Sequence, residues 1–217
     1  AAYTSRIIDI PASTGYGEPI QRLFKLRDGE KVVAAMSLDP RALGGRGVTS
    51  PSKAGSDPAD SRTPHAVAVT SDGYALRFGL EPFVDVSTRA GRRFARPADG
   101  AEVVGVERVR GTEILIAATA EARGLLCKVD EVNYLSGPGK GVILIKLSPG
   151  EDRVLGFVAS TGDRDLLTVE TTRGSEQTIS TGKYEVTGRG GKGRELLQRG
   201  GFARVIRPQP AAPEPLS

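Results

Sequence analysis

The sequence predicts an all-β, propeller-like domain built from four-stranded sheets that repeat about every fifty residues. Three observations predict this class: glycines recur at a near-constant spacing, a short apolar run precedes each of them, and aromatic residues make up only 5% of the chain. With 217 residues the chain is long enough to bury a substantial core. Its 28 glycines and 14 prolines favour many turns over long helices.

The first glycine of each repeat follows a run that is typical of a buried strand. Gly73, Gly124 and Gly174 are separated by 51 and then 50 residues. The runs before them are Ala66–Val69, Ile114–Ala117 and Leu166–Val169. A second glycine follows each first glycine after 17 to 19 residues, at Gly91, Gly141 and Gly193, and Gly17 is an earlier copy.

The one irregular interval is explained by an insertion. Gly17 and Gly91 are 74 residues apart, and the 24 residues from Arg41 to Pro64 are rich in Gly, Ser, Pro and Asp. We expect this segment to be a flexible surface loop, and its removal restores a period of fifty. Residues 1–206 are therefore expected to form a single domain of three full repeats with a half-unit at each end. The Pro-rich residues 207–217 are expected to be a disordered tail.

Each repeat is expected to hold four short strands separated by Gly, Pro, Asp or Ser turns. In the unit of residues 101–150 the predicted strands are Glu102–Val109, Glu113–Ala118, Leu125–Val132 and Val142–Leu147. The second of these is apolar almost throughout, so we expect it to lie deep in the core. One such unit cannot bury both faces of its sheet, and neighbouring units must supply the missing contacts.

Basic residues recur at two aligned positions of the repeat. Four residues after the first glycine stand Arg77, Lys128 and Thr178, and Arg6 matches them near the start of the chain. Five residues after the second glycine stand Arg22, Arg96, Lys146 and Gln198. A position that is basic in successive sheets predicts a cationic stripe around the rim, which suits the phosphates of a curved duplex. Taken singly, each residue is better explained as a cation that solvates an exposed strand position, and only the aligned set favours the stripe.

The loops around the second glycine are the strongest candidates for phosphate contact, because glycine lets the main chain approach a phosphate while Arg and Lys add charge. From Arg189 to Arg207 six basic residues face a single acidic one, Glu195. The predicted DNA-binding residues are Arg22, Arg77, Arg89, Arg92, Arg93, Arg96, Lys128, Lys140, Lys146, Arg189, Lys192 and Arg194.

Composition and motifs favour a protein without chemistry of its own. The net charge is +4 and the pI about 9.3, which alone does not prove a nucleic-acid partner. The single cysteine, Cys127, lies in an apolar run and is expected to be a buried hydrophobe. The only histidine, His65, adjoins the insertion, which is a poor place for a general base. We predict no catalytic residue, metal or cofactor, and no membrane span or signal peptide.

The repeats resemble the carboxy-terminal β-pinwheel of the A subunit of bacterial DNA gyrase and topoisomerase IV. Members of this family have an apolar strand, a Ser/Thr-x-x-Gly turn and a basic strand, much like Val67–Arg77. The segment Thr187–Gly193 is similar to the gyrase signature box, Gln-basic-Arg-Gly-Gly-basic-Gly, at its last five positions. It departs at Thr187 and Gly188 and lies in the final repeat, whereas the gyrase box is usually in the first.

The resemblance implies an accessory domain of an ATP-dependent type II topoisomerase in the bacterial cytoplasm, at the nucleoid. Its partners would be double-stranded DNA, which it would wrap or bend without reading sequence, the rest of the A subunit and the ATPase B subunit. Gyrase-type and topoisomerase IV-type subunits both stay open. The alternative from another class is a propeller-like scaffold for protein–protein interaction, whose rim cations only face solvent.

Overall fold

The computed structural model describes residues 1–10, 15, 17–39, 65–162 and 164–207. Nearly all of its regular structure is β-strand, and its helices are one or two turns long. The expected insertion, residues 41–64, lies outside the described residues, as does the expected tail beyond Arg207. No helix in the described ranges is long and apolar enough to cross a membrane.

The strands are β1 (His65–Thr70), β2 (Tyr74–Gly79), β3 (Val103–Val109), β4 (Ile114–Thr119), β5 (Arg123–Lys128), β6 (Tyr134–Leu135), β7 (Val142–Ile143), β8 (Val154–Ser160), β9 (Leu167–Thr171), β10 (Glu176–Ile179), β11 (Arg194–Glu195) and β12 (Phe202–Ile206). The helices are η1 (Ile7–Asp9), α1 (Ile20–Leu23), η2 (Glu81–Phe83) and η3 (Val129–Glu131). The described residues before β1 contain two of these helices, and an isolated bridge joins Ala2 to Arg92 in the segment between η2 and β3.

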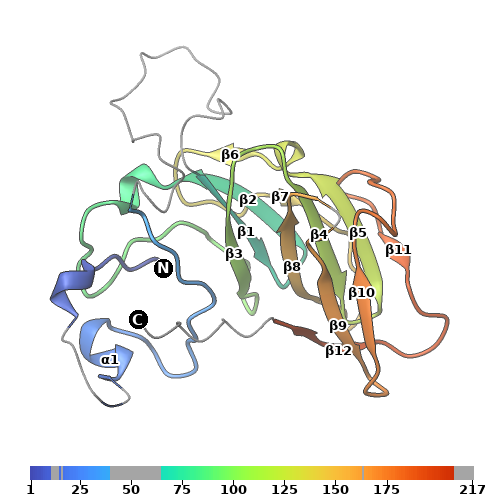
Figure 1. The fold of residues 1–217 in the computed structure, drawn as a ribbon, viewed down its shortest axis with the longest axis horizontal. Coiled ribbons are helices and arrows are strands. Elements are labelled where there is room, and N and C mark those ends of the chain that lie inside the picture. The colour runs from blue at the N-terminus through green and yellow to red at the C-terminus, as the bar shows by residue number, and fades with distance from the viewer. Residues whose placement is uncertain (11–14, 16, 40–64, 163, 208–217) are drawn as a thin grey trace, which may run out of the picture.

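The strands form three sheets that lie side by side (Figure 1). The first sheet has the order β3-β1-β2-β6, and β7 also pairs with β2. The second has the order β8-β4-β5-β11 and the third β12-β9-β10. Each sheet is therefore built on a hairpin, β1-β2, β4-β5 or β9-β10, which strands from later in the chain flank on both sides in the first two sheets and on one side in the third.

This sharing of strands corrects the expectation that one unit folds into one sheet. In the unit 101–150 the hairpin β4-β5 belongs to the second sheet, but β3, β6 and β7 belong to the first. The third predicted strand also ends early: β5 stops at Lys128 and the chain turns through η3. The turn is needed because the chain must leave its own hairpin to reach the outer edge of the preceding sheet. The fourth predicted strand shrinks to Val142–Ile143, because the next two amides, of Leu144 and Ile145, both donate to the carbonyl of Gly73.

The core lies between the sheets. Along β4, Leu115 and Ala117 pack into the cluster shared with the first sheet, while Ile116 and Ala118 pack into the cluster shared with the third. All four side chains are fully buried, which confirms that this strand lies deep in the core. Cys127 is fully buried in the first cluster, and burial raises the pKa of its thiol to about 12, so it serves as a small apolar side chain.

The second glycine of the repeat is required by close packing. Gly141 has a φ of +85°, and a Cβ atom at this position would overlap the main-chain carbonyl of Ala75 in β2. Only a residue without a side chain allows the outer segment to lie this close to the hairpin. Gly141 therefore marks the point in the sequence at which the outer segment packs closely against the hairpin of the preceding sheet.

Replacing Gly141 by Ala is expected to lower the free energy of unfolding by more than about 2 kcal/mol, through strain and overlap with Ala75. Thermal unfolding should show a fall in Tm of at least about 4 °C. Gly162→Ala is the matched control, since a Cβ there meets nothing within 4 Å and the backbone is not left-handed. Equal Tm values for the two variants would contradict this explanation.

The inner strands β3, β8 and β12 line a groove of about 720 Å³ on the hub side of the sheets. Glu107 of β3 lies in it and accepts a hydrogen bond from the amide of Ala159 (2.7 Å). Burial raises the pKa of the Glu107 carboxyl, and the hydrogen bond opposes this only in part. The folded protein therefore binds this proton more tightly than the unfolded chain does, and this contribution to stability is lost as pH rises through the raised pKa.

Glu107→Gln is expected to be more stable than the parent chain above that pKa, because it removes a buried negative charge while its amide oxygen still accepts from Ala159. The difference in Tm should be largest at about pH 8 and should disappear toward the ordinary carboxyl range, near pH 4.5. A difference that is constant with pH would show that the charge is not its cause.

Candidate nucleic-acid interface

The outer edges of the sheets carry four loops that we call the rim loops: residues 17–25, 87–96, 136–146 and 187–195. Each contains one of the second glycines of the repeat. The last two contain β7 and β11, which are outer strands, whereas β3, β8 and β12, which line the hub groove, are inner strands. In the first two sheets the central hairpin thus separates the outer strands from the inner strand.

Main-chain hydrogen bonds join each rim loop to the next. The amide of Lys25 donates to the carbonyl of Arg89 (2.8 Å). The amide of Arg96 donates to the carbonyl of Gly139, and that of Lys146 donates to the carbonyl of Gly191, both at 2.8 Å. The rim loops therefore form one continuous belt that crosses the sheets.

Two of these contacts are equivalent in the repeat. Arg96 and Lys146 both stand five residues after a second glycine, and each donates to a glycine two residues before the next second glycine. Parallel bridges join the same segments, between Ala95 and Gly139 and between Ile145 and Gly191. Both basic side chains are exposed. The repeat thus places a cation at the same point of two successive steps.

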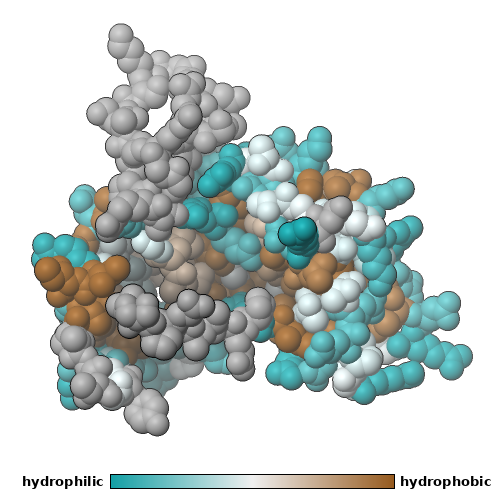
Figure 2. Space-filling view, in the orientation of Figure 1, coloured by the Kyte–Doolittle hydropathy of each residue, from teal (hydrophilic) through white to brown (hydrophobic). Residues whose placement is uncertain are grey.

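All but two of the predicted DNA-binding residues lie on the rim loops, and those side chains are exposed. They are Arg22, Arg89, Arg92, Arg93, Arg96, Lys140, Lys146, Arg189, Lys192 and Arg194. Figure 2 shows hydrophilic side chains along the edge of the molecule that carries β10 and β11. Lys128 is also exposed, but it ends β5 and lies beside η3, outside the rim loops.

Arg77 is the exception, since its side chain is buried and only 4% of the residue is exposed. Its Nε donates to the carbonyl of Val132 (2.6 Å) and its Nη2 to that of Asp130 (3.2 Å). The expectation that Arg77 lies on an exposed stripe with Lys128 is wrong, because Arg77 is buried and Lys128 is exposed. The reason is that the chain at and after η3 lies beside β2 with the carbonyls of Asp130 and Val132 facing that strand. The guanidinium of Arg77 donates to both of them.

Aromatic rings hold several of the rim cations. The Nζ of Lys140 lies 3.9 Å from the ring centre of Tyr74 and 3.8 Å from a carboxylate oxygen of Asp72. The guanidinium carbons of Arg92 and Arg194 lie 6.0 Å from the ring centres of Phe83 and Tyr184. Such contacts are worth about 0.5–1 kcal/mol at exposed sites and reduce the freedom of the cation.

Sequence reasoning missed these rings, although a signal for them exists. An aromatic residue stands ten residues after each first glycine, at Phe83, Tyr134 and Tyr184. The glycine alignment that found the basic positions contains this column too. Tyr134, the middle one, packs edge-on against the buried His65 instead of against a cation.

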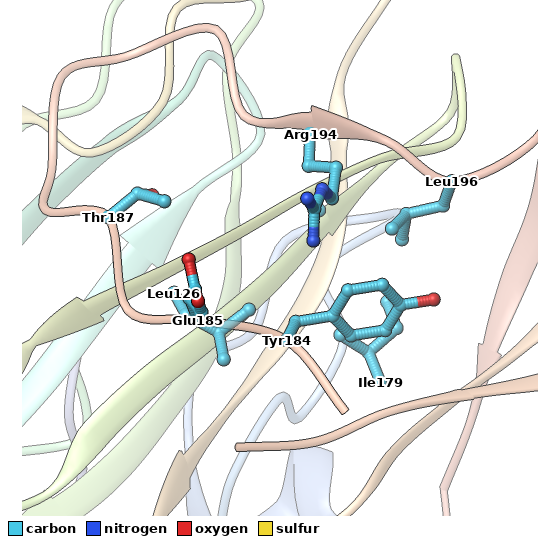
Figure 3. Close-up of a pocket in the computed structure, with 8 residues that line it drawn as sticks. Leu126, Ile179, Tyr184, Glu185, Thr187, Arg194 and Leu196 are labelled. Atoms are coloured by element: carbon cyan, nitrogen blue, oxygen red, sulfur yellow. The ribbon is translucent and has the colours of Figure 1, made fainter. Parts of the chain in front are cut away.

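A small pocket of about 90 Å³ lies beneath the last rim loop, between β5 and the segment that follows β10. In Figure 3 Arg194 reaches down from β11 toward the ring of Tyr184, with Leu196 and Ile179 beside it. The volume suits a few water molecules and is too small for a cofactor. No group of three His, Cys, Asp or Glu side chains that could hold a metal ion occurs in the described part of the chain.

Arg77→Gln is expected to destabilise the fold by about 2 kcal/mol or more, because buried carbonyls of the η3 turn lose their donors. Arg96→Gln removes the same charge from an exposed position and should change the free energy of unfolding by less than about 0.5 kcal/mol. Urea unfolding of both variants measures the difference. If Arg77→Gln were as stable as Arg96→Gln, its guanidinium would have no structural role.

The stacked sheets, their radial order and the belt of outer loops define a β-propeller domain of the pinwheel type. A model of the family described as "DNA gyrase C-terminal domain, beta-propeller" matches residues 9–39, 65–110 and 113–160, more than half of the chain. The chain belongs to this family. Membership places it among the C-terminal accessory domains of type II topoisomerase A subunits, as the resemblance of its repeats implied.

Solved structures share the fold. The C-terminal domain of a DNA topoisomerase IV superposes with a TM-score of 0.70 at 16% identity, over 89% of this chain and 55% of that one. A DNA gyrase A C-terminal domain gives 0.60 at 18% identity, over 88% and 57%. The E. coli ParC C-terminal domain gives 0.51 at 21% identity, over 67% and 62%. The chain thus spans somewhat more than half the length of these structures, and no curated protein matches it.

Proposed function

We propose that the chain binds duplex DNA along its rim loops without reading sequence, and bends or wraps the duplex for a type II topoisomerase. The observation that carries this proposal is the belt of main-chain bonds through Lys25, Arg96 and Lys146, with exposed cations on every loop that it joins. Residues 1–206 would act as one domain. This function needs no catalytic residue in the chain.

The physical basis is the match between a repeated cation and a repeated phosphate. A duplex that follows a curved protein surface presents its phosphates at intervals, and contacts to phosphate carry no sequence information. Bending costs elastic energy, which contacts on successive sheets offset. Because the belt fixes the loops relative to one another, the cations are held in place before DNA arrives and binding costs little further ordering.

The wider setting forms part of the same proposal. The domain would act in the bacterial cytoplasm, at the nucleoid, attached to the remainder of an A subunit that works with an ATPase B subunit. It would guide DNA toward the cleavage core. A subunit of the topoisomerase IV type and one of the gyrase type are equally served by this mechanism.

A scaffold for protein partners is the alternative, and one observation favours it. Ile7, Ile8 and Ile10 on and beside η1 are 80%, 87% and 50% exposed, a composition typical of docking surfaces. These residues lie in the N-terminal segment, at the end of the molecule opposite β10 and β11 (Figure 1), and this segment bridges to the rim loop 87–96 through Ala2 and Arg92. A scaffold function would therefore use a surface that adjoins one rim loop, and substitution of the three isoleucines tests it without removing a rim cation.

Binding to random-sequence duplex, measured against salt concentration, tests the main proposal. Log K should fall linearly with log salt, with a slope of about 0.9 per phosphate neutralised. Competition by a duplex of unrelated sequence should be equally effective. Failure to bind at low salt would rule the proposal out and leave the scaffold function.

The double variant Arg96→Gln, Lys146→Gln removes the two equivalent rim cations and should lower the salt slope by about 1.8, or 0.9 for each phosphate contact. The matched control is Arg110→Gln, Arg153→Gln, which removes two exposed charges beside the inner strands β3 and β8. The control should keep the parent slope. If both double variants lost the same slope, net charge rather than the rim would govern binding.

A further inference from the structure

The last rim loop is held in place by a clamp built on Arg189. Its Nε donates to the carbonyl of Glu131 (2.6 Å) and its Nη1 to the carbonyl of Ile143 (3.3 Å). Its main-chain amide donates to Oε2 of Glu131 (3.1 Å). One residue thus joins the loop to η3 and to the preceding rim loop, so its guanidinium is already occupied on the protein.

The main chain on either side of Arg189 is fixed as well. The amides of Thr187 and Gly188 donate to the carbonyl of Leu126, at 2.9 and 3.2 Å, and that of Gly190 donates to Leu144 (2.6 Å). The Cα of Gly188 lies against the Glu131 carboxylate, which a Cβ would approach to 3.2 Å. The first half of the loop is therefore committed to internal contacts.

The second half of the loop faces outward. Gly191 is exposed, its backbone is not left-handed, and a Cβ there would meet only the amide of Gly193, at 3.9 Å. The fold itself does not require glycine at this position. Lys192 is exposed, and the ion pairs found within the described ranges do not include it. Lys146 is joined to this segment through the carbonyl of Gly191.

We propose that the loop has two parts: Arg189 is a positioning residue, and Lys192 with Lys146 forms the phosphodiester-binding pair that the clamp presents. Gly191 leaves space for the phosphate to approach the main chain. The inference rests on the proposed DNA-binding function and assigns different roles to the basic residues within it. Of the basic residues in the box-like segment, Arg189 therefore acts through its neighbours and does not contact DNA.

The preceding rim loop has the same binding tripeptide without the clamp. Gly139-Lys140-Gly141 matches Gly191-Lys192-Gly193, and Arg96 is joined to it as Lys146 is to the later copy. Gly137 stands where Arg189 stands in the last loop, four residues before the second glycine. There the lysine is held instead by Tyr74 and Asp72. Two different devices thus fix the same lysine position.

A double-mutant cycle tests the division of roles. In the parent chain Arg189→Gln should weaken DNA binding by about threefold or more, while in the Lys146→Gln, Lys192→Gln background it should change binding by less than about twofold. The same fold-change in both backgrounds would show that Arg189 contacts DNA on its own account. Unchanged Tm and circular dichroism exclude unfolding as the cause.

For a second variant, the clamp and simple electrostatics predict opposite changes in DNA affinity. Glu131→Ala removes a negative charge near the rim, which by charge alone strengthens DNA binding. Because the Glu131 carboxylate accepts the main-chain amide of Arg189 (3.1 Å), the clamp predicts weaker binding by about threefold or more. Stronger binding by this variant would overturn the proposal.

Amide hydrogen exchange of the free protein separates this inference from the proposed function. Arg189→Gln should speed exchange at Thr187, Gly188 and Gly190 by about tenfold or more, since their bonds open with the loop, while amides of β4 stay protected. Unchanged exchange rates at these amides would show that Arg189 does not hold the loop, even if the parent chain binds DNA. Loss of DNA binding by the parent chain would instead remove the proposed function and leave this result standing.

Discussion

Everything at the rim depends on one constraint: each rim loop must lie close enough to the next for its main-chain amide to donate to a carbonyl there. The bonds from Arg96 to Gly139 and from Lys146 to Gly191 meet this constraint at successive sheets. Glycine at positions 141 and 193 permits the approach, because a side chain at Gly141 would overlap Ala75 and one at Gly193 would press on the carbonyl of Gly124. Close packing of the main chain thus determines where the cations stand.

Much of the fold could be predicted from the sequence, because the features that define it are local or periodic. The strands β3 and β4 begin and end within a residue or so of the expected positions, since an apolar β-branched run between turns has few other solutions. The pairing of strands could not be predicted in the same way. Which sheet receives β7 depends on where the chain crosses to the preceding hairpin, and the sequence marks this crossing only by the glycines before β7.

The site could be predicted from the sequence only where residues at the same repeat position also make the same contacts in the structure. Arg96 and Lys146 share a column and also a contact, whereas Arg77 and Lys128 share a column but not a role. The guanidinium of Arg77 is drawn inward because the η3 turn that follows β5 leaves carbonyl groups facing β2. A lysine offers a point charge with a flexible stem, so Lys128 could not serve, as Arg77 does, as a planar fork to two carbonyls. Charge alone did not distinguish the two cases.

The sharing of strands between consecutive repeats has a consequence for how such a chain can change length. Since β3 and β8 each complete the sheet begun by the previous hairpin, and in the same register pattern, the junctions between sheets are interchangeable. Excision of about one period between matching residues would bring a hairpin together with a completing strand of the same kind. A cut at any other interval would leave one hairpin without its edge. Gain or loss of whole periods is therefore the natural route by which this architecture lengthens or shortens its rim.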